Sequence, residues 1–270
     1  MKISLFFILI YCSLCLAVFL FQRKLEYIPT GTLLEPQQYD FNEAQSQMFK
    51  SYDGLKLTYW YAGNQNNEAD IILYFHGNAG NLGGRADKLK YIKRNSSFSL
   101  AALSYRGYAA SEGSPSERAF QLDAEMFLKK ILAKGYKLEN IILYGESLGS
   151  AMAIKLASKY KVKAVFLEAP FWSASEVAKQ TYWFLPVELL MIDKYESHKY
   201  LAKFSVPIYM IHGTKDSVTP IEHSRKIYAT LPENLLKTKK EIIGADHLEF
   251  ELDYLNNELH NFINEVNINN

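Results

Sequence analysis

Tyr144-Gly145-Glu146-Ser147-Leu148-Gly149 is the segment that decides the fold of this chain. It follows the apolar run 141–143 and precedes a helical pattern over 151–157. A serine on a sharp strand-to-helix turn has a strained backbone, so the residues two positions before and after it must be small. Gly145 and Gly149 meet this demand. The segment therefore predicts a nucleophile elbow, which exposes the Ser147 hydroxyl above a sheet and turns the Leu148 N–H toward an oxyanion.

Strand-like and helix-like segments alternate on both sides of this turn. Continuous apolar runs predict strands buried on both faces, at 71–75, 99–105, 141–143, 164–167 and 208–212. The longest helical pattern between them ends near Gly135. It is expected to begin with Ser114 as N-cap, Pro115 at the first position and Glu117 closing a capping box. The alternation predicts an α/β fold, with a mostly parallel central sheet and helices on both faces.

Composition limits the possible classes of protein. A chain of 270 residues that is 49% hydrophobic can bury one large core. The formal net charge of +1 offers no electrostatic basis for binding nucleic acid, and we interpret the basic cluster Lys237, Lys239 and Lys240 as a solvated loop. Both cysteines, Cys12 and Cys15, lie in an N-terminal apolar segment. The folded domain is therefore expected to contain neither a disulfide nor a cysteine-based metal site.

The N-terminal apolar segment predicts a membrane anchor. Residues 3–21 carry no charge, and a helix of this length spans roughly 28 Å, close to the thickness of a bilayer core. A cleaved signal peptide is the alternative, because Ser13 and Cys15 are small enough for its cleavage site. We divide the chain into an anchor at 1–24, a connecting segment at 25–46 and a folded domain at 47–270. A hairpin around Asp53-Gly54 is expected at the sheet edge.

Small residues follow the strand at 71–75. They form the loop His76-Gly77-Asn78-Ala79-Gly80-Asn81, in which the backbone can turn tightly and leave N–H groups free to face a ligand. We interpret the Asn78 N–H as the second oxyanion donor, beside that of Leu148. A plain turn before a helix is the alternative. His76 lies at a strand end and is expected to be structural.

Two further residues are candidates for the partners of Ser147. Asp216 follows the strand at 208–212, and His247 follows a short strand expected at 241–243, before a closing helix at 252–263. The chain order Ser147, Asp216, His247 is the order that this architecture requires, and all three lie at carboxyl ends of strands. The other histidines are poorer candidates, since His212 looks internal to a strand and His198, His223 and His260 lie in helical surroundings.

An insertion at 172–205 interrupts the alternation of strands and helices. It is rich in aromatic and aliphatic residues, including Trp172, Trp183 and Phe184, and Pro186 breaks it. Its position after a core strand predicts a small helical lid above the carboxyl edge of the sheet. An ordinary crossover helix packed on the sheet is the alternative. The apolar content would suit an acyl chain or a membrane surface.

Taken together, these motifs resemble the α/β-hydrolase superfamily, and in particular its membrane-anchored serine hydrolases, which include eukaryotic protein depalmitoylases and their bacterial relatives. The resemblance implies hydrolysis of carboxylic esters or thioesters without a cofactor. The depalmitoylases associate with membranes through a cysteine-rich N-terminal region, where this chain has an apolar helix. The motifs that carry the resemblance are His76-Gly77-Asn78-Ala79-Gly80-Asn81, Tyr105-Arg106-Gly107-Tyr108, Ser111-Glu112-Gly113, Gly145-Glu146-Ser147-Leu148-Gly149, Gly213-Thr214-Lys215-Asp216 and Asp246-His247.

The combined prediction is a serine hydrolase with Ser147, His247 and Asp216 as its triad and Asn78 and Leu148 as oxyanion donors. Its expected substrates are lipid-like or acylated esters or thioesters near a membrane. We expect a membrane-anchored monomer with no metal; the alternative location is secreted or periplasmic, after signal cleavage. A serine peptidase on the same fold and a catalytically silent binding protein are the alternative functions.

Overall fold

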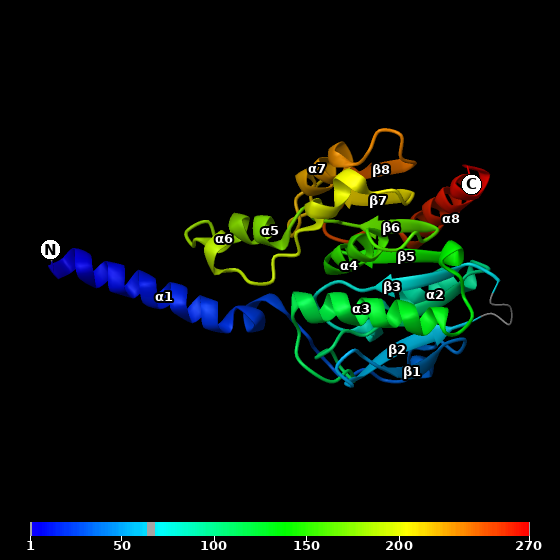
Figure 1. Cartoon of the computed structure of the whole chain (residues 1–270), viewed down its shortest axis with the longest axis horizontal. Coiled ribbons are helices and arrows are strands. Elements are labelled where there is room, and N and C mark those ends of the chain that lie inside the picture. Colours follow the sequence, from blue (N-terminus) through cyan, green and yellow to red (C-terminus); the bar gives the residue numbers. More distant parts are fainter. Residues whose placement is uncertain (1, 64–67, 270) are drawn as a thin grey trace.

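A mostly parallel sheet of eight strands runs through the part of the chain that the computed structural model describes, residues 2–63 and 68–269 (Figure 1). The strand order is β1-β2-β4-β3-β5-β6-β7-β8. Antiparallel pairing is confined to β1 with β2 and β2 with β4, so the predicted parallel sheet and edge hairpin are confirmed. The strands are β1 (Gln45–Lys50), β2 (Lys56–Ala62), β3 (Ile71–Phe75), β4 (Ser99–Leu103), β5 (Ile141–Glu146), β6 (Ala164–Glu168), β7 (Ile208–Gly213) and β8 (Lys237–Ile242).

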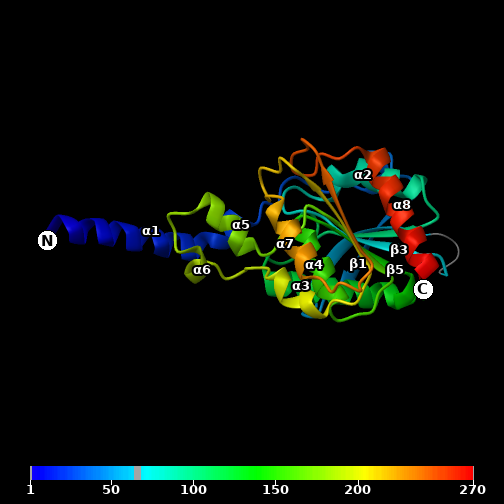
Figure 2. The ribbon, with the colours of Figure 1, turned by 90° about the horizontal axis from the view of Figure 1, so that it is seen from above.

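Helices cover both faces of the sheet, and each face has its own core. Alternate residues of one strand serve the two sides: Leu73 of β3 packs with one core, whereas Tyr74 packs with the other. The first core includes α3 (Glu117–Leu132), α4 (Leu148–Ala157) and α7 (Glu222–Thr230). The second includes α2 (Ala86–Arg94) and α8 (Leu252–Asn269), which lie on the opposite side of the sheet in Figure 2. Short 3₁₀ segments occur at Pro36–Tyr39, Leu82–Arg85, Leu138–Asn140 and Ser197–Lys203.

The N-terminal helix projects from this body. Helix α1 (Lys2–Glu26) extends away from the sheet, and α5 (Ala174–Thr181) and α6 (Val187–Leu190) of the insertion lie beside its carboxyl-terminal half in both views (Figures 1 and 2). By length and composition α1 can cross a membrane between Ser4 and Glu26. The insertion is helical: α6 contacts α1, whereas the 3₁₀ segment Ser197–Lys203 packs on the first core through Leu201.

Three details differ from the sequence expectations. The N-cap of α3 is Ser116, whose side chain accepts the Ala119 N–H, and not Ser114. The lysine cluster does not form a loop: Lys237, Lys239 and Lys240 belong to the edge strand β8, where a charged side chain is tolerated because one side of an edge strand faces solvent. Helix α8 also continues beyond 263 to Asn269, because Val266 adds another buried contact.

Candidate active site

Ser147 occupies a strained turn between β5 and α4. Its backbone has φ 48° and ψ −111°, in the left-handed half of conformational space that non-glycine residues rarely adopt. The glycine at each side has no room for a side chain. A Cβ on Gly149 would lie 2.0 Å from the Phe75 carbonyl oxygen, and one on Gly145 would lie 2.6 Å from that of Gly149. The packing between α4 and β3 thus requires the small residues that flank the serine.

The same turn leaves a donor beside the serine. Leu148 is the first residue of α4, so its N–H has no partner one helical turn earlier and belongs to the free amino end of the helix. The Ser147 N–H is already bound to the Glu168 carbonyl oxygen at 2.9 Å. Among the two amides, that of Leu148 is therefore the one available to an oxyanion.

Asp216 and His247 are hydrogen-bonded to each other. The His247 Nδ1 lies 2.7 Å from the Asp216 Oδ2, and because a carboxylate only accepts, Nδ1 carries the proton and Nε2 is left as the basic nitrogen. The other carboxylate oxygen accepts the N–H groups of Val218 and Thr219 at 2.9 and 2.6 Å. These contacts hold Asp216 in one orientation against the imidazole.

A tight contact brings the two loops together. A Cβ on Gly213, at the end of β7, would lie 2.4 Å from the Ala245 carbonyl oxygen, so only glycine lets the loop before His247 approach β7 this closely. The Lys215 N–H binds the same carbonyl at 3.0 Å. The Asp246 carboxylate accepts the N–H groups of Ser217 and His247. These hydrogen bonds give Asp246 a structural role in the turn before His247.

His212 is a partner of Asp216 that sequence reasoning missed. Its Nε2 lies 3.1 Å from the Asp216 Oδ2 and 2.7 Å from the Thr219 carbonyl oxygen, and the side chain is fully buried. Both neighbours are acceptors, so Nε2 carries a proton and donates to them. The strand position of His212 was predicted; its contact with a residue four positions later depends on how the chain turns after β7.

The surroundings of Asp216 favour its charged form. Burial by itself would raise the pKa of this carboxyl, but hydrogen bonds from His212, His247 and the Thr219 N–H outweigh burial and hold the pKa below its ordinary range. The carboxylate is therefore ionised beside the imidazole at neutral pH.

A stability measurement tests this environment. Because folding lowers the pKa of Asp216, its charge stabilises the fold fully above the unfolded value of about 4, and the contribution disappears as the pH falls through the folded value. Asp216→Asn should therefore be destabilising at pH 7, with the difference from the natural chain shrinking as the pH falls below about 4. Urea denaturation across pH 3–7 measures it; a difference that stays constant over this range would contradict the assigned environment.

Asn78 links the glycine-rich loop to its neighbours. Its side-chain oxygen accepts the Tyr108 hydroxyl at 2.7 Å, and its side-chain nitrogen donates to the main-chain carbonyl of Glu26 at the end of α1. Gly80 continues the contact, since its N–H donates to the Ile28 carbonyl oxygen at 3.1 Å. The side chain of Asn78 is therefore occupied in fixing the loop.

His76 is buried in this loop. Its Nδ1 donates to the Gly77 carbonyl oxygen at 2.6 Å, and its ring packs against Tyr105 with centroids 4.3 Å apart. Burial, aided by the nearby Arg85 charge, lowers the pKa of His76 to about 4, so the ring is neutral at physiological pH. This environment suits a structural histidine.

A buried network of charges lies beneath the serine turn, and sequence reasoning did not find it. Lys88 Nζ lies 2.8 Å from both carboxylate oxygens of Glu168, and Arg85 Nε lies 3.5 Å from Glu146. The hydroxyl groups of Tyr74 and Tyr144 donate to Glu146 and Glu168. All four acidic and tyrosine side chains are essentially inaccessible to solvent.

Opposite charges make this network tolerable. Burial alone would raise the pKa of Glu146, but the charges of Lys88 and Arg85 outweigh burial and lower it to about 2. Burial raises the pKa of Glu168, against the opposing charge of Lys88. The sequence feature that could have revealed this network is a pair of glutamates at the carboxyl ends of apolar strands, because a buried charge needs a partner.

The carboxyl edge of the sheet thus gathers the predicted residues. Ser147 follows β5, and the hydrogen-bonded Asp216 and His247 follow β7 and β8. Within the described residues, no hydrogen bond joins Ser147 to His247; such bonds are often loose without substrate. The described residues also contain no group of three metal-ligating side chains.

Comparisons with known proteins agree with this architecture. The α/β hydrolase fold family matches residues 70–190. An esterase of Pyrococcus furiosus superposes with a TM-score of 0.72 over 89% of this chain and 98% of its own, at 16% sequence identity, which shows a common fold. The chain belongs to the α/β-hydrolase superfamily, as its motifs predicted, and this membership supports a hydrolase activity.

Two relatives are more similar in sequence. An uncharacterized protein of Mycobacterium tuberculosis is 29% identical over 233 residues, which cover 86% of this chain and 82% of that protein. The α/β hydrolase domain-containing protein 17C of Xenopus tropicalis is 31% identical over 189 residues. Those residues cover 68% of this chain but 58% of the 17C protein. The predicted resemblance to α/β-hydrolase-domain proteins is confirmed.

Proposed function

We propose that this protein is a serine hydrolase that cleaves carboxylic esters or thioesters through an acyl-enzyme intermediate. The observation that carries the proposal is the hydrogen bond between His247 and Asp216 at the same edge of the sheet as the strained turn of Ser147. An esterase among the proteins of the same fold supports ester bonds as the target.

The first step is acylation. His247 Nε2 takes the proton from the Ser147 hydroxyl as its oxygen attacks the carbonyl carbon of the substrate. Asp216 stabilises the imidazolium that forms and keeps Nδ1 protonated. The alcohol or thiol then leaves with the proton from His247, and the acyl group remains bound to Ser147.

The oxyanion of each tetrahedral intermediate is assigned to the N–H groups of Leu148 and Asn78. The first belongs to the free amino end of α4, and the second lies in a loop that Tyr108 and Glu26 hold in place. A single donor of this kind contributes about 3 kcal/mol to catalysis in enzymes from which it has been removed. Water activated by His247 then attacks the acyl-enzyme and releases the acid.

We assign α1 as a membrane anchor that stays on the mature protein. The support is its attachment to the folded body: Arg23 forms an ion pair with the buried Asp193 at 2.9 Å, and Tyr27 binds the same carboxylate at 3.1 Å. A signal peptide has no need of contacts with the domain that it leaves. The natural substrates are accordingly assigned to lipid-like or acylated molecules at a membrane.

A fluorophosphonate probe tests the proposed function. The full chain should be labelled once, at Ser147, and Asp216→Asn should slow labelling at least about 100-fold because the imidazole loses its correct tautomer. A control assay compares p-nitrophenyl butyrate with a matched p-nitroanilide; a peptidase would cleave the anilide. Absence of labelling in the natural chain would leave a catalytically silent binding protein as the function.

A further inference from the structure

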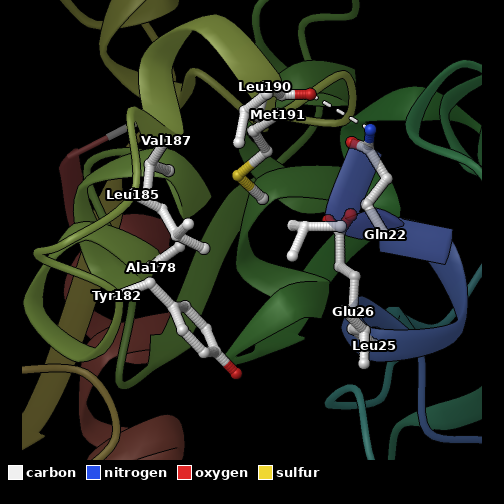
Figure 3. A pocket seen from close by; sticks show the side chains of 10 residues that line it. Gln22, Leu25, Glu26, Ala178, Tyr182, Leu185, Val187, Leu190 and Met191 are labelled. Carbon is white, nitrogen blue, oxygen red and sulfur yellow. Dashed lines mark hydrogen bonds between the residues drawn. The ribbon is translucent and has the colours of Figure 1, made fainter. Parts of the chain in front are cut away.

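An apolar cavity lies between α1 and the insertion (Figure 3). Its volume is about 150 Å³, and its lining comes from four residues of α1 and six of the insertion. Val18 and Leu25 line it from α1, and Ala178, Leu190 and Met191 line it from the insertion. The N-terminal helix is therefore one wall of an apolar cavity and not an isolated anchor.

Hydrogen bonds fasten the insertion along α1. The side chain of Gln22 donates to the Leu190 carbonyl oxygen at 3.0 Å and accepts the Ile192 N–H at 2.7 Å. The Tyr11 hydroxyl donates to the Phe184 carbonyl oxygen at 2.9 Å. Tyr11 and Gln22 are eleven residues apart, so the insertion follows α1 for about 16 Å at the rise of an α-helix.

This attachment fixes the depth of the insertion in a bilayer. Where α1 crosses a membrane, a segment that accompanies it for about 16 Å enters the adjoining leaflet. Backbone groups in hydrocarbon need protein partners, and Gln22 provides them for Leu190 and Ile192. The charged pair of Arg23 and Asp193 lies immediately beyond, where the polar body begins.

The outer surface of the insertion carries several exposed apolar side chains, beside one exposed ion pair between Lys179 and Glu188. Trp183 is 81% exposed and Leu189 is 84% exposed, with Ile192 and Tyr182 also exposed. Large apolar side chains grouped on one surface are typical of contact with a membrane or partner. Their position beside a helix that can span a bilayer identifies the lipid as what covers them.

One residue of the cavity lining also contacts the candidate active site. Glu26 lines the cavity, and its main-chain carbonyl oxygen accepts the side chain of Asn78 in the proposed oxyanion loop. Both carboxyl oxygens of Glu26 are buried and have no hydrogen-bond partner among the described residues. The cavity is thus mainly apolar and carries an unsatisfied polar group on the residue that contacts the loop, which is the arrangement an amphiphile fits.

We propose that the cavity between α1 and the insertion binds the acyl chain of a lipid-like ester, which enters sideways from the membrane leaflet with its polar end toward Glu26. This inference rests on the proposed function for the identity of the ester, but the binding of the chain can be measured without catalysis. It makes the transmembrane helix part of the substrate site.

A substitution that fills the cavity tests the proposal. Ala178→Phe places a large side chain in the lining, and Thr181→Phe places the same side chain at an exposed position of α5 outside it. With the full chain in lipid vesicles, Ala178→Phe should lower the ratio of kcat/KM for p-nitrophenyl palmitate to that for p-nitrophenyl butyrate at least tenfold. Thr181→Phe should leave both rates as in the natural chain. An unchanged ratio in Ala178→Phe would overturn the proposal.

A binding measurement separates this proposal from the proposed function. In the Ser147→Ala background, which cannot turn over, cis-parinaric acid should bind with a Kd at least tenfold weaker after Ala178→Phe and unchanged after Thr181→Phe. Loss of this difference overturns the acyl site even if the protein is an active esterase. A retained difference without ester hydrolysis by the natural chain supports the acyl site and contradicts the proposed function.

Tryptophan fluorescence tests whether the insertion lies in the membrane leaflet, as entry of the acyl chain from that leaflet requires. Brominated phosphatidylcholine in the vesicles should quench the fluorescence of the natural chain, and Trp183→Phe should remove most of this quenching. Of the two other tryptophans, Trp60 is buried in the folded body, and Trp172 packs against the first core and stacks on His198. Quenching that persists unchanged in Trp183→Phe, or no quenching in the natural chain, would show that the insertion does not lie in the leaflet.

Discussion

Ser147→Ala is expected to reduce the turnover of p-nitrophenyl butyrate by about 10⁴-fold or more, because no acyl-enzyme can form without the serine oxygen. The fold should be retained, since alanine is no larger than serine and the Ser147 side chain accepts no helix-capping hydrogen bond. The rate is measured with the full chain in detergent, together with its thermal midpoint.

Ser158→Ala is the matched control for this prediction. Ser158 lies at the other end of α4, where its exposed hydroxyl binds the Lys155 carbonyl oxygen. Its replacement should leave the rate within about twofold, as expected for a surface change away from the site. Turnover by Ser147→Ala near that of Ser158→Ala would refute the role of Ser147.

Lys88→Met is expected to lower the free energy of unfolding by about 3–5 kcal/mol, the usual cost of removing one partner of a buried ion pair. Lys88 contacts both oxygens of Glu168, whose side chain is completely buried. Without it, Glu146 and Glu168 lie together with Arg85 as the remaining cation of the network. Urea denaturation of the full chain in detergent measures the change.

An exposed ion pair provides the comparison. Lys226 pairs with Glu176 at 2.8 Å, and its side chain is half exposed, so Lys226→Met should cost less than about 1 kcal/mol. Adding Glu168→Gln to Lys88→Met should recover part of the lost stability, because the unpaired buried charge is removed. Equal costs for the two lysine substitutions would show that the network beneath the serine turn is not a buried ion-pair system.

Local patterns predicted the parts of the fold that depend on neighbouring residues. The strained serine turn was predicted because Gly145 and Gly149 are required within five residues, and the buried strands were predicted because their apolar runs are continuous. The positions of Asp216 and His247 after their strands were predicted from the alternation of strands and helices along the chain. Their mutual hydrogen bond is a fact of the structure, whereas their roles remain predictions.

Features that depend on distant residues were not predictable from these patterns. The contact of His212 with Asp216 and that of Lys88 with Glu168 join groups whose approach is set by the turn of the chain and the packing of α2 on the sheet. Ser114 and Ser116 both offer a capping hydroxyl, and the sequence does not show which one the backbone places at the helix end. The lysines of β8 led to the prediction of a loop, because a cluster of charged residues is typical of loops as well as of edge strands.

The contact between residues 26–30 and the glycine-rich loop determines where the chain can be shortened to obtain a soluble enzyme. Pro29 and Gly80 form a β-bridge, and the Thr30 carbonyl oxygen accepts the side chain of Asn81. A truncated form that begins before Glu26 keeps these supports of the loop, although it lacks the apolar helix. One that begins after Thr30 removes them together with the membrane segment, so its inactivity would report a collapsed loop and not a need for lipid.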